Sequence, residues 1–336
     1  MNKRVTIKDI AKALDVSIST VSRALKDSPE ISPKTRELIK KTAKDMKYHP
    51  NPIAVALKTS KSHTIGVIVP KIVNTFYAGV VEGIEEIADK HGYQVFVSST
   101  NEDYQKEVKH VNAFINSRAD GVILSLSRGT TVLDHIQHLQ DLEIPTVLFD
   151  RTTKNLKIPR VVTDDAKAAY KAVMHLINGG AKNIAMLSGP KHLLIGRNRT
   201  RGYQEALEKA GLTFNPDLVI HSDFTIDNAQ KATKSLLENE DVDAIFCLND
   251  DLAVGAIYAA KELGLNVPED VAVVGFYNSK RSHYMNPSIS TVDLNPHELG
   301  VLAAGLLFEH ITSGEVDNEK EIVVPSNLII RESSKR

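Results

Sequence analysis

Small hydroxyl side chains and a single arginine lie close together near the start of the sequence. A helix that begins after Ser17 has an apolar inner face formed by Val21, Ala24 and Leu25. Its outer face carries Ser19, Ser22, Arg23 and Lys26. Hydroxyl and guanidinium groups form hydrogen bonds with the edges of DNA bases and with phosphates. The outer face therefore has the chemistry of a helix that enters the DNA major groove.

The segment before Ser17 predicts the helix that supports this outer face. One apolar helix side is formed by Ile7, Ile10, Ala11 and Leu14. Thr6 and Asp9 have the spacing of a capping box, so we expect the helix to begin there. Two short helices joined by a tight turn are typical of a helix-turn-helix. An ordinary helical hairpin is the alternative, because the spacing alone fits both.

The N-terminal segment is also basic. Residues 1–61 contain 14 Lys and Arg against 6 Asp and Glu, which leaves the rest of the chain with a net charge of −9. Ser32 and Pro33 predict the start of a third helix. Its inner side is expected to consist of Leu38, Ile39, Ala43 and Met46. A basic head on an acidic body indicates a polyanionic partner at one end, unless the lysines merely cluster on a solvated helix.

Length and composition limit the class of protein. A chain of 336 residues predicts about two domains, and a hydrophobic content of 42% is ample for buried cores. The single cysteine, Cys247, lies in the apolar run AIFCL and is expected to be a buried small hydrophobic residue. One thiol forms no intrachain disulfide, which fits a reducing cytoplasm. We find no secretion signal and no apolar run long enough to span a membrane.

From Thr64 onward, predicted strands alternate with predicted helices. The strands are expected at 64–69, 93–99, 121–125, 146–150, 183–189, 218–222, 244–249, 271–276 and 321–332. The helices are expected at 76–91, 107–117, 200–210, 228–237 and 252–263. This alternation predicts an α/β fold with parallel sheets that helices cover on both faces. Two rounds of the pattern indicate two similar lobes.

Several segments together resemble the LacI/GalR family of bacterial transcription regulators. The most specific are the head TIKDIAKALDVSISTVSRAL and the segment YHPNPIAVALK. TIGVIVP, the FDR at 149–151, VAVVGF and VPSNLIIRES stand where the family has core strands, so the resemblance covers essentially the whole chain. It implies an all-α helix-turn-helix head at 1–49, a hinge helix and linker at 50–63, and a two-lobed effector-binding and dimerisation core at 64–336 that is similar to periplasmic binding proteins. The lobes are expected at approximately 64–162 plus 293–325, and 163–292 plus 326–336.

The resemblance implies a transcriptional repressor that binds double-stranded operator DNA through the second helix. Arg23 can donate two hydrogen bonds to guanine, Ser19 can bond a base edge, and Ile18 can pack on a thymine methyl group. Phosphate contacts are expected from Thr6, Ser17, Thr20 and Ser22. A helix cap or a solvated side chain is the alternative interpretation for each hydroxyl.

The resemblance also implies that the hinge helices of two subunits pair in the DNA minor groove. Leu57 would be an apolar wedge between base pairs, with Ala54 beside it, Lys58 on the backbone, and Asn51 at the start of the helix. Alternatively, Leu57 packs against the core. The family usually has arginine where this chain has Val55, so one cation is missing. Because one head covers one half-site, a palindromic operator implies a homodimer.

The core is expected to bind a small, carbohydrate-like effector between the lobes, at the carboxyl ends of the parallel strands. The positions that match the family's effector site are Phe76, Tyr77, Asp150, Arg199, Phe224, Asn249 and Tyr277. Alternatively, Asp150 and Arg199 form a structural ion pair and Phe224 belongs to the core. Sugar-responsive relatives have an acid at Tyr277, and a phenol cannot replace it as a double acceptor, which argues against an ordinary hexose. The sequence does not decide between an inducer and a co-repressor.

Two other classes of protein compete with this interpretation. An enzyme with a nucleotide-binding fold needs a phosphate-binding loop, and we find neither G-x-G-x-x-G after a strand nor a Walker loop. His297 and Glu298 lack the second histidine of a zinc helix, and no nucleophilic triad is evident. A secreted solute-binding protein would have a secretion signal and no basic head. We therefore expect no catalytic residue, no metal and no cofactor.

Overall fold

The computed structural model describes residues 5–49, 61–314 and 317–336. The chain divides into two compact units, Met1–His63 and Thr64–Arg336. The predicted hinge residues Asn51, Ala54, Leu57 and Lys58 lie outside the described residues.

The described part of the first unit is helical. Its helices are α1 (Ile7–Ala13), α2 (Ile18–Leu25) and α3 (Pro33–Asp45). The predicted starts of α1 and α2 are both confirmed. The backbone N–H and the hydroxyl of Thr6 donate to Asp9 over 2.8 and 2.7 Å, and the hydroxyl of Ser17 accepts from the N–H of Thr20 over 3.0 Å. These caps satisfy N–H groups that a short helix leaves without partners.

A small hydrophobic core holds the three helices together. Ile10, Val21, Ala24 and Ile39 are fully buried in it. The prediction for Leu38 is wrong, because this side chain is 52% exposed. Residues that face inward on a helix recur every three or four positions, so Ile39, Ala43 and Met46 form the inner side and Leu38 lies beside it.

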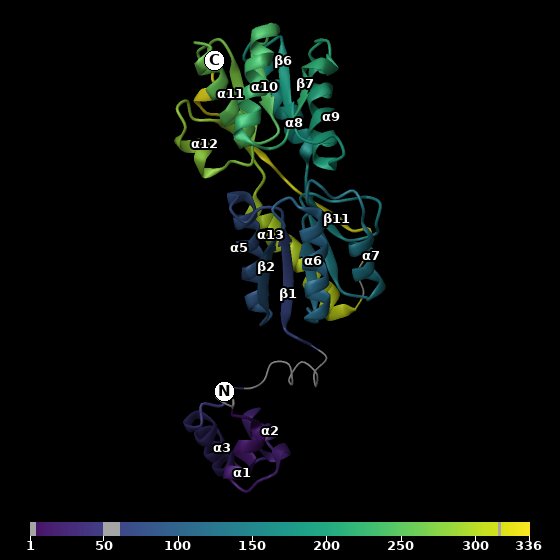
Figure 1. Ribbon diagram of the computed structural model, residues 1–336, viewed down its shortest axis with the longest axis vertical. Helices are drawn as coiled ribbons and strands as arrows, with labels where there is room; N and C mark the ends of the chain where they lie inside the picture. Colours follow the sequence, from purple (N-terminus) through teal and green to yellow (C-terminus); the bar gives the residue numbers. More distant parts are fainter. Residues whose placement is uncertain (1–4, 50–60, 315–316) are drawn as a thin grey trace. The chain divides into compact units, whose positions relative to one another are not determined.

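The second unit contains two sheets, each the centre of one lobe (Figure 1). The first lobe has the strand order β11-β5-β4-β3-β1-β2. Its strands are β1 (Thr64–Val69), β2 (Gln94–Ser99), β3 (Gly121–Leu124), β4 (Thr146–Phe149), β5 (Arg160–Thr163) and β11 (Glu321–Val324). All of their pairings are parallel, and β3 and β4 are buried along their whole length. Full burial requires helices on both faces of the sheet.

The second lobe repeats this arrangement in the order β12-β10-β9-β8-β6-β7. Its strands are β6 (Ile184–Ser188), β7 (Val219–His221), β8 (Ala244–Cys247), β9 (Ala272–Phe276), β10 (Ser290–Asp293) and β12 (Asn327–Ile329). The last strand, β12, departs from the parallel prediction because it runs antiparallel to β10. Cys247 is fully buried in β8, as predicted.

Helices cover both sheets. Those of the first lobe are α5 (Thr75–Lys90), α6 (Tyr104–Asn116), α7 (Asp134–Asp141) and α13 (Pro296–Ser313). Those of the second lobe are α8 (Asp165–Asn178), α9 (Leu194–Lys209), α10 (Ile226–Asn239), α11 (Asp250–Glu262) and α12 (Lys280–Tyr284). Two short 3-10 helices span Pro216–Leu218 and Glu332–Ser334.

The backbones of α5 and α13 approach each other closely because glycines meet at their contact. A Cβ atom on Gly83 would stand 2.1 Å from the carbonyl oxygen of His297, and one on Gly300 would stand 2.0 Å from that of Val80. Larger side chains would push the helices apart. This contact fixes α13, a late segment of the chain, to the first lobe.

The chain passes between the lobes at three places within the described residues: after β5, after β10 and after β11. These crossings bring the ends of β4 and β9 and the starts of α5 and α9 to the region between the lobes. The α/β architecture predicted from the sequence is therefore confirmed, with two lobes that each combine distant parts of the chain.

Candidate DNA-binding surface and effector site

The start of α2 (Ile18–Leu25) presents a cluster of hydroxyl groups. The Ser17 oxygen lies 2.7 Å from the hydroxyls of both Ser19 and Thr20. The first turn of α2 contains no acidic residue. A helix N-terminus without a carboxylate attracts phosphate through its free N–H groups and its dipole. Ser17 thus caps the helix, and this turn is also suited to contact a DNA backbone.

Arg23 and Ile18 present different chemistry on the exposed side of α2. The Arg23 guanidinium is 57% exposed and lies 3.1 Å from the Glu30 carboxylate. Ile18 is 46% exposed, which is unusual for an isoleucine in a small domain. Because an exposed ion pair contributes only about 0–1 kcal/mol, Glu30 does not prevent Arg23 from reaching a DNA base.

Six of the seven residues predicted to bind an effector are buried between the lobes. The exception is Phe224, which is half-buried. Asp150 follows β4, Asn249 follows β8 and Tyr277 follows β9, so the carboxyl ends of three strands supply them. The structure brings these residues together, but largely as partners of one another.

Tyr77 and Asp150 form a buried hydrogen bond in the first lobe. The Tyr77 hydroxyl donates to an Asp150 carboxylate oxygen over 2.8 Å. Burial raises the pKa of Asp150 to about 6, against the opposing effect of Arg151 and Arg199. This carboxyl group is thus less acidic than an exposed aspartate.

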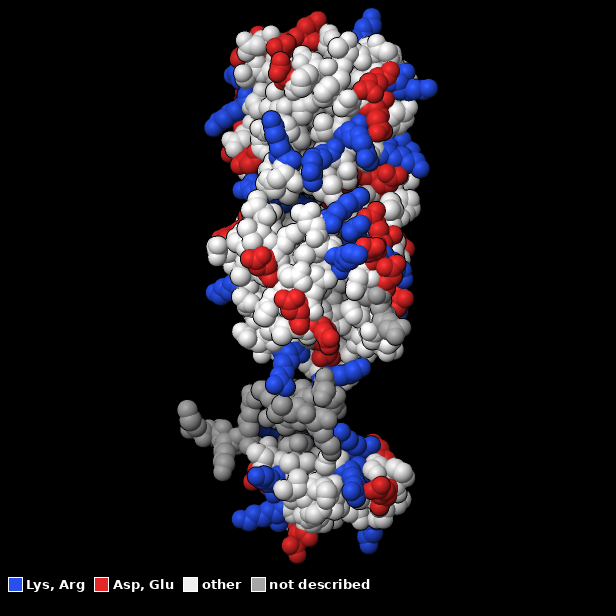
Figure 2. Space-filling model, turned by 90° about the vertical axis from the view of Figure 1, so that its right-hand side faces the viewer, with Lys and Arg blue, Asp and Glu red and all other residues white. Residues whose placement is uncertain are grey.

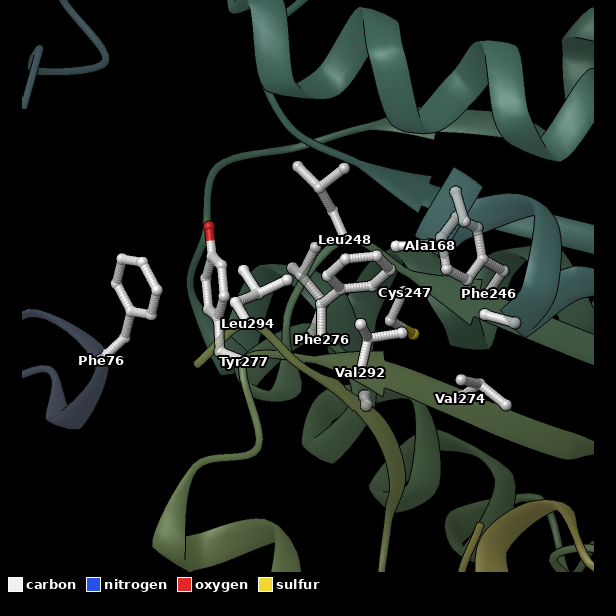
Figure 3. Close-up of a cluster of buried hydrophobic side chains, with 14 of the residues drawn as sticks. Phe76, Ala168, Phe246, Cys247, Leu248, Val274, Phe276, Tyr277, Val292 and Leu294 are labelled. Atoms are coloured by element: carbon white, nitrogen blue, oxygen red, sulfur yellow. The ribbon is translucent and has the colours of Figure 1, made fainter. Parts of the chain in front are cut away.

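The rings of Phe76 and Tyr277 stack across the boundary between the lobes (Figure 3). Their centroids are 4.9 Å apart. Tyr277 has a φ of 94°, a conformation that costs a non-glycine residue energy and is often found at functional sites. The stack joins α5 of the first lobe to the end of β9 in the second.

Arg199 is fully buried and has all of its strong partners within the second lobe. Its Nε donates to Asp165 over 2.8 Å and its Nη1 donates to the Leu248 carbonyl over 2.6 Å. Its guanidinium also lies 4.1 Å from the Phe276 ring centroid. The alternative of an Asp150–Arg199 ion pair is therefore wrong, because the acidic partner of Arg199 is Asp165.

Asn249 and Phe224 both have structural contacts. The Asn249 side-chain oxygen accepts from the N–H of Leu252 over 2.8 Å and so caps α11. The Phe224 ring lies 5.2 Å from the Arg151 guanidinium. A Cβ on Gly189 would come within 2.4 Å of this ring, so a larger residue there would force the ring to move. Phe224 thus lies at the border between the core and the region between the lobes.

A cavity of about 620 Å³ lies beside this buried cluster, and none of the seven predicted residues lines it. Its walls come from the segments after β3 and β4 in the first lobe and from the start of α9 in the second lobe. Arg151, Arg197 and Arg201 are among the lining residues that sequence reasoning missed. The run RNRTR at 197–201 contains the signal, because positions 197 and 201 share one helix face while Arg199 lies on another.

We expect the Asp150→Asn variant to gain stability relative to the native chain as pH rises from about 4 to about 7. The folded-state pKa of about 6 lies above the unfolded value of about 3.9, so the native state binds more protons in this window and its free energy of unfolding falls as pH rises. Asparagine removes this effect, about 1–3 kcal/mol, yet still accepts from Tyr77. Urea unfolding of the native chain and of the variant, at about pH 4 and about pH 7, measures this difference in the free energy of unfolding. Equal pH slopes for the two proteins would show that Asp150 does not titrate differently on folding.

Among the described residues, no three His, Cys, Asp or Glu side chains are placed to hold a metal ion. None of the described helices is long and apolar enough to cross a membrane.

A helix-turn-helix head followed by a two-lobed α/β core defines a DNA-binding regulator with a ligand-binding core. Residues 6–51 match the bacterial regulatory proteins of the lacI family. Residues 62–332 match the periplasmic binding proteins and sugar binding domain of the LacI family. The chain belongs to the LacI family, as its sequence motifs predicted.

Individual relatives match along nearly the whole chain. Catabolite control protein A of Priestia megaterium is 34% identical, over 98% of this chain and 99% of its own. The transcriptional repressor CytR of Escherichia coli K12 is 33% identical, over 98% of this chain and 96% of its own. The regulator CelR in complex with cellobiose is 29% identical, with a TM-score of 0.75 and coverage of 98% and 100%. The Lac repressor dimer bound to operator, at 24% identity, 99% coverage of both chains and a TM-score of 0.86, shares the fold.

Proposed function

We propose that this protein is a transcriptional repressor that binds a palindromic operator as a homodimer and responds to a carbohydrate-like effector between its lobes. The observation that carries the proposal is the exposed face of α2, with Ile18, Ser19 and Arg23, on a small basic domain that precedes a two-lobed core. Relatives named as repressors support the DNA-binding role. The cellobiose complex of CelR supports a sugar-like effector.

Residue roles in the head follow from exposure and chemistry. Ile18, Ser19 and Arg23 contact bases, since a small apolar group, a hydroxyl and a guanidinium discriminate base edges in the major groove. Phosphate contacts come from Thr6, Ser17, Thr20 and Ser22. Asn51, Ala54, Leu57 and Lys58 act in the minor groove, a role that rests on their sequence alone.

One side of the core carries exposed apolar residues that a second copy of this chain would cover. In Figure 1, α5 and β2 of the first lobe and α11 and α12 of the second lobe lie on the same side of the core. Exposed hydrophobic residues in or beside these elements are Ile72, Val73, Phe96, Tyr258 and Tyr284. Val73 is 86% exposed and Tyr284 is 82% exposed, which is costly for a monomer in water. A dimer would cover this surface and also place two heads on one palindrome.

The effector binds between the lobes, beside Phe76, Tyr77, Asp150, Arg199, Phe224, Asn249 and Tyr277. These residues shape and stiffen the region, and opening of the Phe76–Tyr277 stack would expose both rings to a ligand. A ligand that prefers one arrangement of the lobes changes DNA affinity by its difference in binding energy between arrangements.

The remaining assignments follow from this role. The domain boundaries are 1–49 for the head, 50–63 for the hinge and linker, and 64–336 for the core, with each lobe built around one sheet. The protein acts in the cytoplasm, where its DNA is, and catalyses no reaction. These points rest on the relatives being regulators and on the reasoning from sequence.

Selection of binding sites from a random duplex library tests this proposal. We expect two inverted half-sites around a central step that kinks easily, such as CG or CA. Sedimentation of the complex should give two chains for each duplex. A single unrepeated half-site, or one chain on each duplex, would contradict the proposed dimeric repressor.

A further inference from the structure

The cavity between the lobes is unusually rich in positive charge. Four of its lining residues are Arg151 and Lys154, which follow β4, and Arg197 and Arg201 from the first two turns of α9. No aspartate or glutamate of the described chain is among the residues that line it. A cavity built for neutral sugar hydroxyls needs acceptors such as carboxylates, whereas this one offers mainly donors.

Half of this charge has no counter-charge among the described residues. Arg151 donates to both oxygens of Glu102 over 3.0 and 2.7 Å. Arg201 lies 3.6 Å from Glu205, in a pair with both side chains more than half exposed. Lys154 and Arg197 form no ion pair with any residue in the described parts of the chain. Like charges that face one cavity repel each other, and an anion bound between them would relieve this repulsion. Lys154 and Arg197 would then hold the anion from opposite lobes.

Two buried groups in the cavity wall also lack partners. Arg151 and Thr152 are each 6% exposed, and both line the cavity. Within the described residues, neither the Arg151 Nε nor the Thr152 hydroxyl has a hydrogen-bond partner. A buried polar group without a partner costs free energy, and such groups often mark a place where a ligand or water completes the hydrogen bonding.

The backbone adds to the same preference for an anion. Helix α9 begins at the cavity after Leu193, which provides no side-chain cap, and its first turn contains no acidic residue. A smaller cavity of about 280 Å³ shares Arg197 and Arg201 and adds Lys191 to its walls. Figure 2 shows lysine and arginine side chains gathered around the waist of the core on this face.

We propose that the natural effector is a phosphorylated sugar whose phosphate group is bound between Lys154 of the first lobe and Arg197 of the second. This inference rests on the proposed effector-controlled function and narrows its ligand class. A phosphate monoester has a charge of about −1.5 to −2 at neutral pH, which matches two unpaired cations better than a carboxylate does. Several threonine and asparagine residues also line the cavity, beside four leucines, and suit the hydroxyl groups of a sugar; they are Thr130, Thr131, Thr153, Asn155 and Asn198.

Isothermal titration calorimetry of the full-length protein at about 0.15 M salt tests this inference. The probes are glucose 6-phosphate and ribose 5-phosphate, the parent sugars, gluconate and inorganic phosphate. We expect at least one phosphate ester to bind ten or more times as tightly as its parent sugar, gluconate and inorganic phosphate. Lys154→Gln and Arg197→Gln should each weaken that ester about tenfold. Lys209→Gln, an exposed cation at the far end of α9, is the matched control and should leave its affinity within about twofold.

The outcomes separate this inference from the broader function. Preferential binding of a parent sugar, or no binding of either ester, overturns the phosphate inference while operator binding can still succeed. Equal binding of gluconate overturns the choice of phosphate over carboxylate, and equal binding of inorganic phosphate overturns the sugar part. Unchanged affinity in the Lys154 and Arg197 variants overturns the assigned position. Failure to select any DNA sequence instead overturns the repressor function itself.

Discussion

Alanine in place of Arg23 is expected to remove most of the preference for one base pair in each half-site of the operator. A guanidinium that donates two hydrogen bonds to guanine contributes about 1–3 kcal/mol of discrimination, and a dimer loses this contribution twice. In the protein without DNA, the Arg23 side chain is exposed and forms only a surface ion pair with Glu30. Its replacement should therefore leave the fold of the head intact. Binding to every single-base variant of the selected operator, measured by fluorescence anisotropy, gives the preference directly.

Lys44→Ala is the matched control for this prediction. Lys44 is an exposed cation near the end of α3, so its loss removes the same charge without changing α2. We expect this variant to bind all sequences slightly more weakly and to keep the order of preference. If Arg23→Ala behaves in the same way, Arg23 contacts phosphate and the base-reading role is wrong.

The Asp165→Asn variant is expected to lose about 3–5 kcal/mol of unfolding free energy. Asp165 is the acidic partner of Arg199, and both are buried in the second lobe. Removal of the carboxylate charge leaves the guanidinium without its hydrogen-bonded counter-charge in a region of low dielectric constant. The Leu248 carbonyl and the Phe276 ring compensate only in part. Urea unfolding monitored by circular dichroism measures the loss.

Asp251→Asn makes the same chemical change at an exposed ion pair. Asp251 lies 2.9 Å from Arg281, and both side chains are about half exposed. We expect a loss below about 1 kcal/mol for this variant. The double variant Asp165→Asn with Arg199→Met removes both charges and should recover much of the stability. Equal losses for the buried and the exposed variants would contradict the assigned role of the Arg199–Asp165 pair.

Local sequence signals predicted the head well. Capping residues such as Thr6, Ser17 and Ser32 form bonds within three residues of themselves, so their effect on helix starts is visible in the sequence. The strands that are buried on both faces are equally visible as apolar runs. The elements α7, α8, α12, α13, β5 and β10 were not predicted. Helix α13 is apolar around most of its circumference, so it has no periodicity to detect. The strands β5 (RVVT) and β10 (STVD) contain too few apolar residues to stand out as apolar runs.

The candidate effector site was harder to predict because its contacts join distant segments. The sequence placed Asp150 and Arg199 in one region, but it contained nothing to show that Asp165 is the partner of Arg199. The start of α9 was predicted six residues too late, at Thr200 instead of Leu194. With the longer helix, Arg197 and Arg201 share a face that lines the cavity. This alignment explains why the charge of the cavity emerged only from the structure.

The affinity of the full-length protein for its selected palindrome, compared with a scrambled duplex of equal length, tests the central claim most directly. At about 0.15 M salt we predict a preference of at least ~10³-fold for the palindrome. Residues 61–336, which include the unit Thr64–Arg336 with its own cores, should show no preference between the duplexes. Equal affinity of the full-length protein for both duplexes, or a preference retained by residues 61–336, would contradict the account.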